Sequence, residues 1–360
     1  MSYGKYGCSG TFSAVVGLQS SSLSAASILI LSMHRSYTKK TGNDFRWGSE
    51  MIEGFINSNA KRREAFFNVY ETSISTIRSP EQKKESLGLN EVLIYRYCGK
   101  EPPEGKFKEV SHAIPIFLGN KTIIDRLECD NCNHHFGDHL EDSFAKYLNP
   151  FRPFQRTRGR SGIPTYKDQD LRISASSQDH VDIYMLADQE LSSLQMQGEN
   201  KLKFVLQRQP YYPVAVHKSL IKIAIAMMPS EDHERLAVLK QWLLMKDNQP
   251  IMSNIPVIEW AASGPINPNR IVCMVGKARE EFRSEYFLYT FIFCYANMQY
   301  QLIVPVMDEE AGRNKAFVFA PVLLSDSHFR AYGPCGHVEK YLDSDQQVRG
   351  ESVELLLKYE

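Results

Sequence analysis

Residues 127–141, with the sequence LECDNCNHHFGDHLE, concentrate side chains that can bind metal ions or move protons. They contain two cysteines, two asparagines, three histidines and four carboxylates. Thiolates and imidazoles are the usual ligands of structural zinc, whereas Mg²⁺ prefers oxygen ligands. A neutral imidazole can also act as a general base near pH 7. The stretch therefore predicts a structural zinc knuckle, a catalytic metal site, or both together.

The preceding residues 97–121, YCGKEPPEGKFKEVSHAIPIFLGNK, add a Cys-Gly-Lys turn, a histidine in SHAIP and an LGN sequence. Together the two stretches resemble the HNH endonuclease family, which has the ββα-metal fold. The resemblance covers a small part of the 360 residues, but several ordered motifs match at once. It implies a metal-dependent enzyme that hydrolyses phosphodiester bonds in DNA.

The resemblance implies roles for three residues. His112 in SHAIP is the implied general base, and Asn133 after CDNC is an implied ligand of a catalytic Mg²⁺ or Mn²⁺ ion. Asn120 in LGN is implied as the residue that braces the loop carrying the base. Asn133 could instead be a helix N-cap, a position that favours asparagine. The alternation of Val110, His112 and Ile114 predicts a strand at the base.

One position departs from the family pattern. Many members have Asp or His immediately before the base as a second metal ligand, and this chain has Ser111. On the expected helix, Glu141 shares a face with Asn133 and is the preferred additional ligand. His135 and His139 form an H-x-x-x-H pair on another face. The buried stripe of this helix is expected to comprise Phe136, Leu140, Phe144 and Leu148.

The zinc site shows a second departure. A four-cysteine site needs two C-x-x-C knuckles, but Tyr95 stands where the first knuckle would begin. His134 or His135 could supply a fourth ligand. Alternatively, zinc has been lost and apolar packing by Tyr95 and Tyr97 holds the knuckle. The expected zinc ligands are Cys98, Cys129 and Cys132.

A basic stretch follows the expected helix, which should end near Leu148. No acidic residue lies between Asp142 and Asp168. Because the net charge of the chain is zero, any affinity for nucleic acid must come from such a local patch. The stretch predicts a surface that follows DNA phosphates. The alternative is a solvated linker, since residues 149–168 are rich in Pro, Gly and Arg. The candidate DNA contacts are Arg152, Arg156, Arg158, Arg160 and Lys167.

The remaining sequence predicts helices and then strands. Apolar residues recur at helical spacing in residues 47–80, 213–228 and 231–245. Residues 285–306 predict two strands joined near Ala296-Asn297, and residues 315–324 predict another. We therefore expect an α+β fold, with a ββα-metal nuclease domain followed by a helical segment and a mainly antiparallel β module.

We expect three regions, an N-terminal arm and helix over 1–88, the nuclease domain with its basic loop over 89–168, and a C-terminal module over 169–360. The apolar stretch 12–32 is interrupted by Gln19 and serines, which favours an arm over a targeting or membrane segment. Seven dispersed cysteines with one C-x-x-C favour a reducing compartment, so we expect a cytoplasmic protein.

The leading hypothesis is an HNH endonuclease acting on double-stranded DNA, as a bacterial defence, restriction or mobile-element effector. Its C-terminal module would then control targeting, sense a signal, or bind a second copy or a protein partner. A second hypothesis is a non-catalytic zinc-knuckle protein that binds nucleic acid, which Ser111 and Tyr95 favour. In a third, the C-terminal module is the principal functional part and binds a small ligand or a protein.

Overall fold

A computed structural model describes residues 13–14, 28–29, 49–77, 82–89, 91, 94–102, 106, 108–169, 171–175, 181–185, 193–196, 201–264, 266–322 and 324–358. The apolar stretch 12–32 lies almost entirely outside these residues, so its expected role as an arm stays a prediction. None of the helices in the described residues is both long and apolar enough to cross a membrane.

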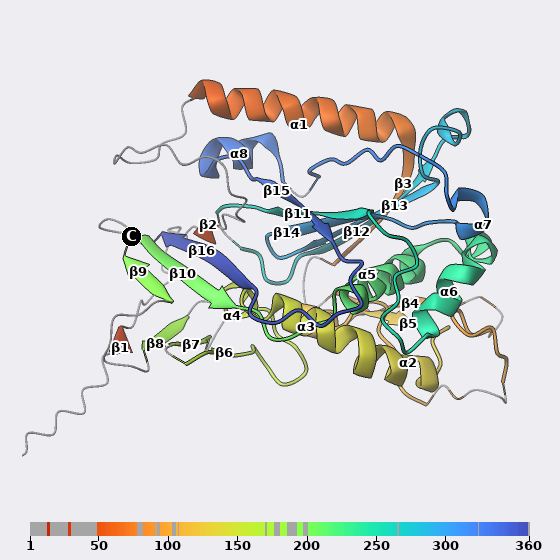
Figure 1. The fold of residues 1–360 in the computed structure, drawn as a ribbon, viewed down its shortest axis with the longest axis horizontal. Coiled ribbons are helices and arrows are strands. Elements are labelled where there is room, and N and C mark those ends of the chain that lie inside the picture. The colour runs from red at the N-terminus through yellow and green to blue at the C-terminus, as the bar shows by residue number, and fades with distance from the viewer. Residues whose placement is uncertain are drawn as a thin grey trace, which may run out of the picture.

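A six-stranded sheet forms the centre of the fold (Figure 1). Every neighbouring pair of its strands is antiparallel. The two inner strands β13 and β14 are buried along their whole length, so both faces of the sheet are covered there. In spatial order the strands are β15 (His337–Tyr341), β11 (Pro256–Ala261), β14 (Met298–Ile303), β13 (Tyr289–Tyr295), β12 (Ile271–Ala278) and β3 (Tyr70–Ile77).

Helices cover the sheet on both sides (Figure 1). Helices α1 (Ser49–Val69) and α8 (Asp326–Tyr332) lie on one side, where the rings of Phe55 and Phe329 meet edge to face. The other side carries α5 (Pro213–Met227) and a continuous helical run formed by α2 (Asp130–Phe136), the π-helical turn η2 (Gly137–Glu141) and α3 (Asp142–Leu148). The candidate catalytic helix is thus packed against the body of the protein.

Smaller elements complete the fold. One sheet has the order β1 (Ser13–Ala14), β8 (Asp182–Met185), β7 (Leu171–Ser174), β6 (Tyr166–Lys167). A second has the order β2 (Ile28–Leu29), β16 (Ser352–Lys358), β10 (Lys201–Gln207), β9 (Leu194–Met196). Strand β4 (Glu85–Leu87) pairs in parallel with β5 (Ile123–Asp125). The short helices are α4 (Arg152–Gln155), α6 (Ala237–Leu244) and α7 (Met307–Glu310), with 3₁₀ turns η1 (Ile116–Leu118), η3 (Ser230–Asp232), η4 (Glu234–Leu236) and η5 (Glu280–Phe282).

One connected hydrophobic core joins these layers. It includes residues of α1, of the α2–η2–α3 helix and of the central sheet, such as Phe66, Phe144 and Tyr300. The aromatic rings of Phe144 and Tyr300 meet edge to face, which packs α3 directly on β14. The mixed α+β class, with an antiparallel sheet in the C-terminal part, is therefore confirmed. The division into three regions stays a prediction.

The helix predicted over 47–80 is too long. Helix α1 ends at Val69, and the chain continues directly into strand β3. Residues 70–77, YETSISTI, alternate and include β-branched residues, which favour strands. Their backbone pairs in register with β12, with Ile74 opposite Met274. Pairing with a strand two hundred residues away in the chain thus outweighs the helical pattern.

The strand predicted over 315–324 is also wrong. Apart from a single bridge at Ala316, the described residues of this segment form no strand. Side chains of β14 bond its backbone instead, since the Gln299 amide donates to the Ala320 carbonyl and Gln301 donates to the Val318 carbonyl. The apolar residues of this segment therefore pack beside the sheet without forming a strand of it.

The remaining predicted helices and strands agree more closely with the structure. Two strands meet at Ala296-Asn297 as predicted, and Ala296 adopts a left-handed conformation with φ of 50° in the tight turn. The helix expected over 213–228 is α5, although it is buried almost all round instead of on one face. Within 231–245 the helix proper is the shorter α6, and residues 149–168 include α4 instead of forming an extended loop.

Candidate active site

An open hollow lies between the segment that carries His112 and the first turns of the α2–η2–α3 helix. Its volume is about 760 Å³. The charged and polar side chains that line it come from three separate stretches of the chain. They are Glu109, His112, Asn133, His134, Asp138, Glu141 and Arg160. Asn133, Gly137 and Glu141 all line the hollow, so the helix presents the face that the four-residue spacing predicted.

His112 is held by backbone pairing with β5. The residue makes an isolated antiparallel bridge with Ile124, where the sequence predicted a longer strand. Burial lowers the pKa of the His112 imidazole, and the positive charges of Lys222 and Arg160 lower it further. The imidazole is consequently neutral at pH 7, the state in which it can accept a proton.

Asn120 shapes the loop that follows His112. It is fully buried, and its amide donates to the carbonyls of Ile114 and Ile123 over 2.8 and 2.9 Å. Its oxygen accepts from the backbone N–H groups of Thr122 and Ile123. Four such bonds fix the turn between His112 and β5. The preceding Gly119 has φ of +91°, and a Cβ there would lie 3.0 Å from the side chain of Thr157.

Glu109 lies beside the start of helix α2. No sequence motif indicated this carboxylate as a site residue. Its Oε2 is 2.9 Å from Nε2 of His134 and 3.3 Å from the Asn133 amide nitrogen. Asp130 fixes this turn by accepting hydrogen bonds from the backbone N–H groups of Lys108 and Glu109. Both Glu109 and His134 are about half exposed in the hollow.

Ser111 faces the interior. It is 2% exposed, and its hydroxyl donates to the Glu128 carbonyl over 3.3 Å. Glu141 lies near the floor of the hollow, 3.8 Å from the ammonium of Lys222, and burial raises its pKa. His135 and His139 do not line the hollow, and Nε2 of His135 lies 3.0 Å from the carbonyl of Leu243 in the last turn of α6.

Two buried ion pairs that no local sequence pattern indicates involve residues near His112 and helix α2 in the chain. The Arg96 guanidinium lies 3.1 Å from Asp125, and both side chains are almost fully buried. The Lys222 ammonium, which comes from α5, lies 3.0 Å from Glu128. Burial raises the pKa of Glu128 to about 7 against the opposing effect of Lys222. The pair of Lys222 and Glu128 connects the segment that carries His112 and α2 to helix α5 in the C-terminal half of the chain.

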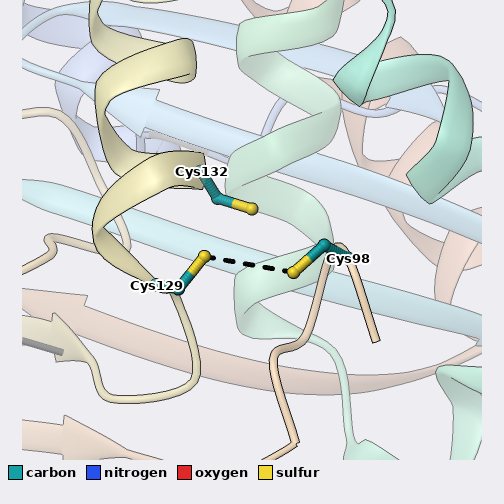
Figure 2. A group of neighbouring side chains, drawn as sticks. All are labelled: Cys98, Cys129 and Cys132. Carbon is teal, nitrogen blue, oxygen red and sulfur yellow. Dashed lines mark hydrogen bonds between the residues drawn. The ribbon is translucent and has the colours of Figure 1, made fainter. Parts of the chain in front are cut away.

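Three cysteines point toward one another beside the start of α2 (Figure 2). The sulfurs of Cys98 and Cys129 are 3.9 Å apart, and all three sulfurs lie within 4.8 Å of each other. Adjacent thiolates on a tetrahedral zinc ion have a similar separation, since each Zn–S bond is about 2.3 Å. Burial raises the pKa values of Cys129 and Cys132, the effect that a bound cation would counteract.

The fourth zinc ligand is not supplied by either histidine suggested from the sequence. His134 bonds Glu109, and His135 bonds the Leu243 carbonyl. Tyr95 and Tyr97 are buried beside the cysteines, and Tyr97 meets Phe136 edge to face. Apolar packing therefore supports the knuckle together with the three cysteines, a combination that the sequence analysis treated as alternatives.

The basic stretch divides into buried and exposed residues. Arg152 is 9% exposed, and its guanidinium donates to the Phe117 carbonyl over 3.1 Å, so we withdraw it as a DNA contact. The aromatic residues of this stretch, Phe151, Phe154 and Tyr166, belong to the core. Arg156 is half-buried and forms the left-handed cap of α4. The exposed cations are Arg158, Arg160 and Lys167.

Comparison with known proteins gives one match. Residues 96–149 match the family model described as HNH endonuclease. No curated protein and no solved structure matches the chain. The resemblance inferred from the motifs in residues 97–141 is therefore confirmed, with bounds that enclose the three cysteines, His112 and the helix as far as its C-terminal end.

Proposed function

Starting from the HNH endonuclease domain at residues 96–149, we propose that the protein hydrolyses phosphodiester bonds in double-stranded DNA with His112 as general base. The observation that carries this proposal is the shared hollow, in which His112 faces Asn133, Glu109 and Arg160. In this mechanism the neutral His112 imidazole accepts a proton from the attacking water. Asn120 acts through the backbone, by holding the turn next to the base.

A divalent cation fits the oxygen ligands of the hollow. Asn133 and Glu109 are neighbours that carry an amide and a carboxylate oxygen, the kind of donor that Mg²⁺ and Mn²⁺ accept, and it is the Asn133 amide nitrogen that faces Glu109 in this structure. Glu109 compensates for Ser111, whose hydroxyl faces the interior. Asp138 and Glu141 are the other carboxylates of the hollow, and Glu141 lies 3.8 Å from the ammonium of Lys222. When bound, the ion supplies Lewis acidity toward the phosphate.

A structural zinc ion fits the cluster of Cys98, Cys129 and Cys132. Zinc at this position would fix the start of helix α2, and thereby the position of Asn133, the residue that directly follows Cys132. The ββα-metal class is part of the same proposal, supported by the bridge between His112 and Ile124 and by the helix that follows it.

The substrate is an anion, and exposed cations lie around the hollow. Arg160 lines it, and Arg158 is exposed two residues earlier. A nuclease domain joined to a larger body is the organisation expected of a restriction, defence or mobile-element enzyme, and we retain this biological role as part of the proposal. The described C-terminal sheet would then contribute to control or to partner binding.

The test is cleavage of supercoiled plasmid with Mg²⁺, Mn²⁺ or EDTA. We expect cleavage with either metal ion and none with EDTA. His112→Ala should lower the rate by about 10²–10⁴-fold, the usual contribution of a general base. Asn133→Ala and Glu109→Gln should instead raise the metal concentration needed for half-maximal cleavage. Thermal melting of each variant should remain close to that of the wild type.

Two results would contradict this proposal. Wild-type protein that is inert with both metal ions would remove the enzymatic claim, and equal rates for wild type and His112→Ala would remove the base. The inward-facing Ser111 favours one other function, a nucleic-acid-binding protein that has lost its chemistry. That protein would bind plasmid without cutting it, so the same assay separates the two functions.

A further inference from the structure

Lys222 lies within helix α5, far in the chain from residues 96–149, yet its ammonium group contacts the backbone of His112. Its Nζ donates a hydrogen bond to the His112 carbonyl over 2.8 Å. The same atom lies 3.0 Å from Glu128 and 3.8 Å from Glu141. An ammonium has three donors, and these neighbours provide three acceptors around it. Lys222 is 1% exposed, so water does not compete for these contacts.

The charge of Lys222 is maintained inside the protein. Burial alone would lower the pKa of its ammonium, but the carboxylates of Glu128 and Glu141 outweigh burial and raise it. A buried cation is tolerated when it is paired and hydrogen-bonded, and removing one partner leaves the other charge uncompensated. Lys222 is therefore a buried, charged residue whose ammonium group is held against the backbone carbonyl of His112.

We propose that Lys222 is a positioning residue for the His112 base and that helix α5 is an integral part of the nuclease site. This inference rests on the proposed role of His112 in cleavage. Lys222 holds the carbonyl of His112 and links it to Glu128, the residue before Cys129. The hydroxyl of Tyr97, which precedes Cys98, donates to the Lys222 carbonyl over 3.1 Å. Base, cysteine cluster and α5 are thus directly connected.

Helix α5 contains a matched control for this role. Lys218 lies one turn earlier and is equally buried. Its Nζ donates to the carbonyls of Met245 and Asp247 over 2.8 and 3.0 Å, and it lies over the Trp242 ring. It therefore holds the segment after α6, and its hydrogen bonds do not reach the hollow. A general effect of removing a buried lysine from α5 should appear equally in Lys218→Met.

The experiment compares wild type, Lys222→Met, Lys222→Arg and Lys218→Met in the full-length protein. We measure the single-turnover cleavage rate, the Kd for DNA, the zinc content and the melting temperature. Lys222→Met should lower the cleavage rate by about 10²-fold, the effect expected of a displacement near 1 Å at a reacting group. Its Kd for DNA should be unchanged. Lys222→Arg should recover part of the rate, and Lys218→Met should cut at the wild-type rate per folded molecule.

Should Lys222→Met fail to fold because Glu128 is left unpaired, the double variant Lys222→Met/Glu128→Gln takes its place. It removes the uncompensated charge but still lacks the bond to His112, so we expect the same loss of rate. Cleavage at the wild-type rate by either folded variant would overturn the positioning role while leaving the proposed function intact. A wild-type protein that does not cut would instead overturn the proposed function, and this inference with it.

Discussion

The surroundings of the His112 imidazole on balance disfavour its protonated form, which lowers its pKa. Burial is the largest cause, followed by the positive charges of Lys222 and Arg160. A base must be unprotonated to accept a proton, so activity is lost as pH falls through its pKa. Because that pKa lies below its usual value of 6.5, the low-pH loss of activity should be displaced toward acid.

The corresponding prediction concerns cleavage rate against pH at saturating metal ion. The midpoint of the acidic limb should lie below pH 6.5, and the rate should be independent of this group at pH 7 and above. Melting curves across the same range serve as the control for acid unfolding. A midpoint above pH 6.5 in protein that remains folded would contradict the environment assigned to His112.

Individual site residues differ in how far the sequence could reveal them. Asn120 and Asn133 lie within short motifs, and their positions relative to the base follow from local chain geometry. Glu109 was missed because one loop carboxylate looks like any other until Asp130 fixes its turn. Lys222 gave no signal at all, since its contact with His112 joins residues 110 positions apart in the chain.

The cysteine cluster joins the turn at Cys98 to the start of helix α2. We expect about one zinc ion per chain, because three converging thiols match the ligand type and spacing of structural zinc. Cys129→Ser should lower both zinc content and melting temperature, since metal binding and folding are coupled. Elemental analysis and thermal melting measure the two effects.

Cys273→Ser is the control for this substitution. Cys273 has the same 2% exposure as Cys129, but it lies on β12 and outside the cluster. It should therefore retain zinc, whatever its own effect on stability. The prediction is contradicted if wild-type protein prepared without chelators contains no zinc, or if Cys129→Ser retains it.

Helices and strands were predictable where the local pattern of apolar residues was enough to determine the secondary structure. The helix α5 and the β13–β14 hairpin have strong local signals, and both are present. Residues 70–77 and 315–324 show why other segments were misassigned. Residues 70–77 pair as a strand with β12, which is distant in the sequence. Residues 315–324 have backbone carbonyls that are hydrogen-bonded by glutamine side chains of β14. In both segments the structure is determined by contacts with residues distant in the sequence, and local periodicity carries no information about such contacts.

The whole molecule has no net charge, so attraction to DNA must be local. Arg158 and Arg160 are exposed beside the hollow, and Arg160 lines it. Replacing both with Ala should weaken binding to all DNA sequences and flatten its salt dependence. Each phosphate contact contributes about 0.9 to the slope of log K against log salt concentration. A binding titration at several salt concentrations measures this slope.

Arg330→Ala is the matched control for the basic surface. Arg330 is exposed on α8, on the opposite side of the central sheet from α2 and α3 (Figure 1), and it is paired with Glu53. Its removal should leave the slope unchanged. An unchanged slope in the Arg158→Ala/Arg160→Ala protein would show that these cations do not contact phosphate.

The buried pair of Glu128 and Lys222 limits how residues 96–149, the HNH endonuclease domain, can be recombined with other proteins. A chimera that receives residues 96–149 without α5 would place Glu128 in a foreign interior without its cation. The graft would carry every recognisable motif and still lack the support beneath the base. If Lys222 positions His112 as proposed, we expect an exchange of residues 96–149 between proteins to require that helix α5 is inherited with them.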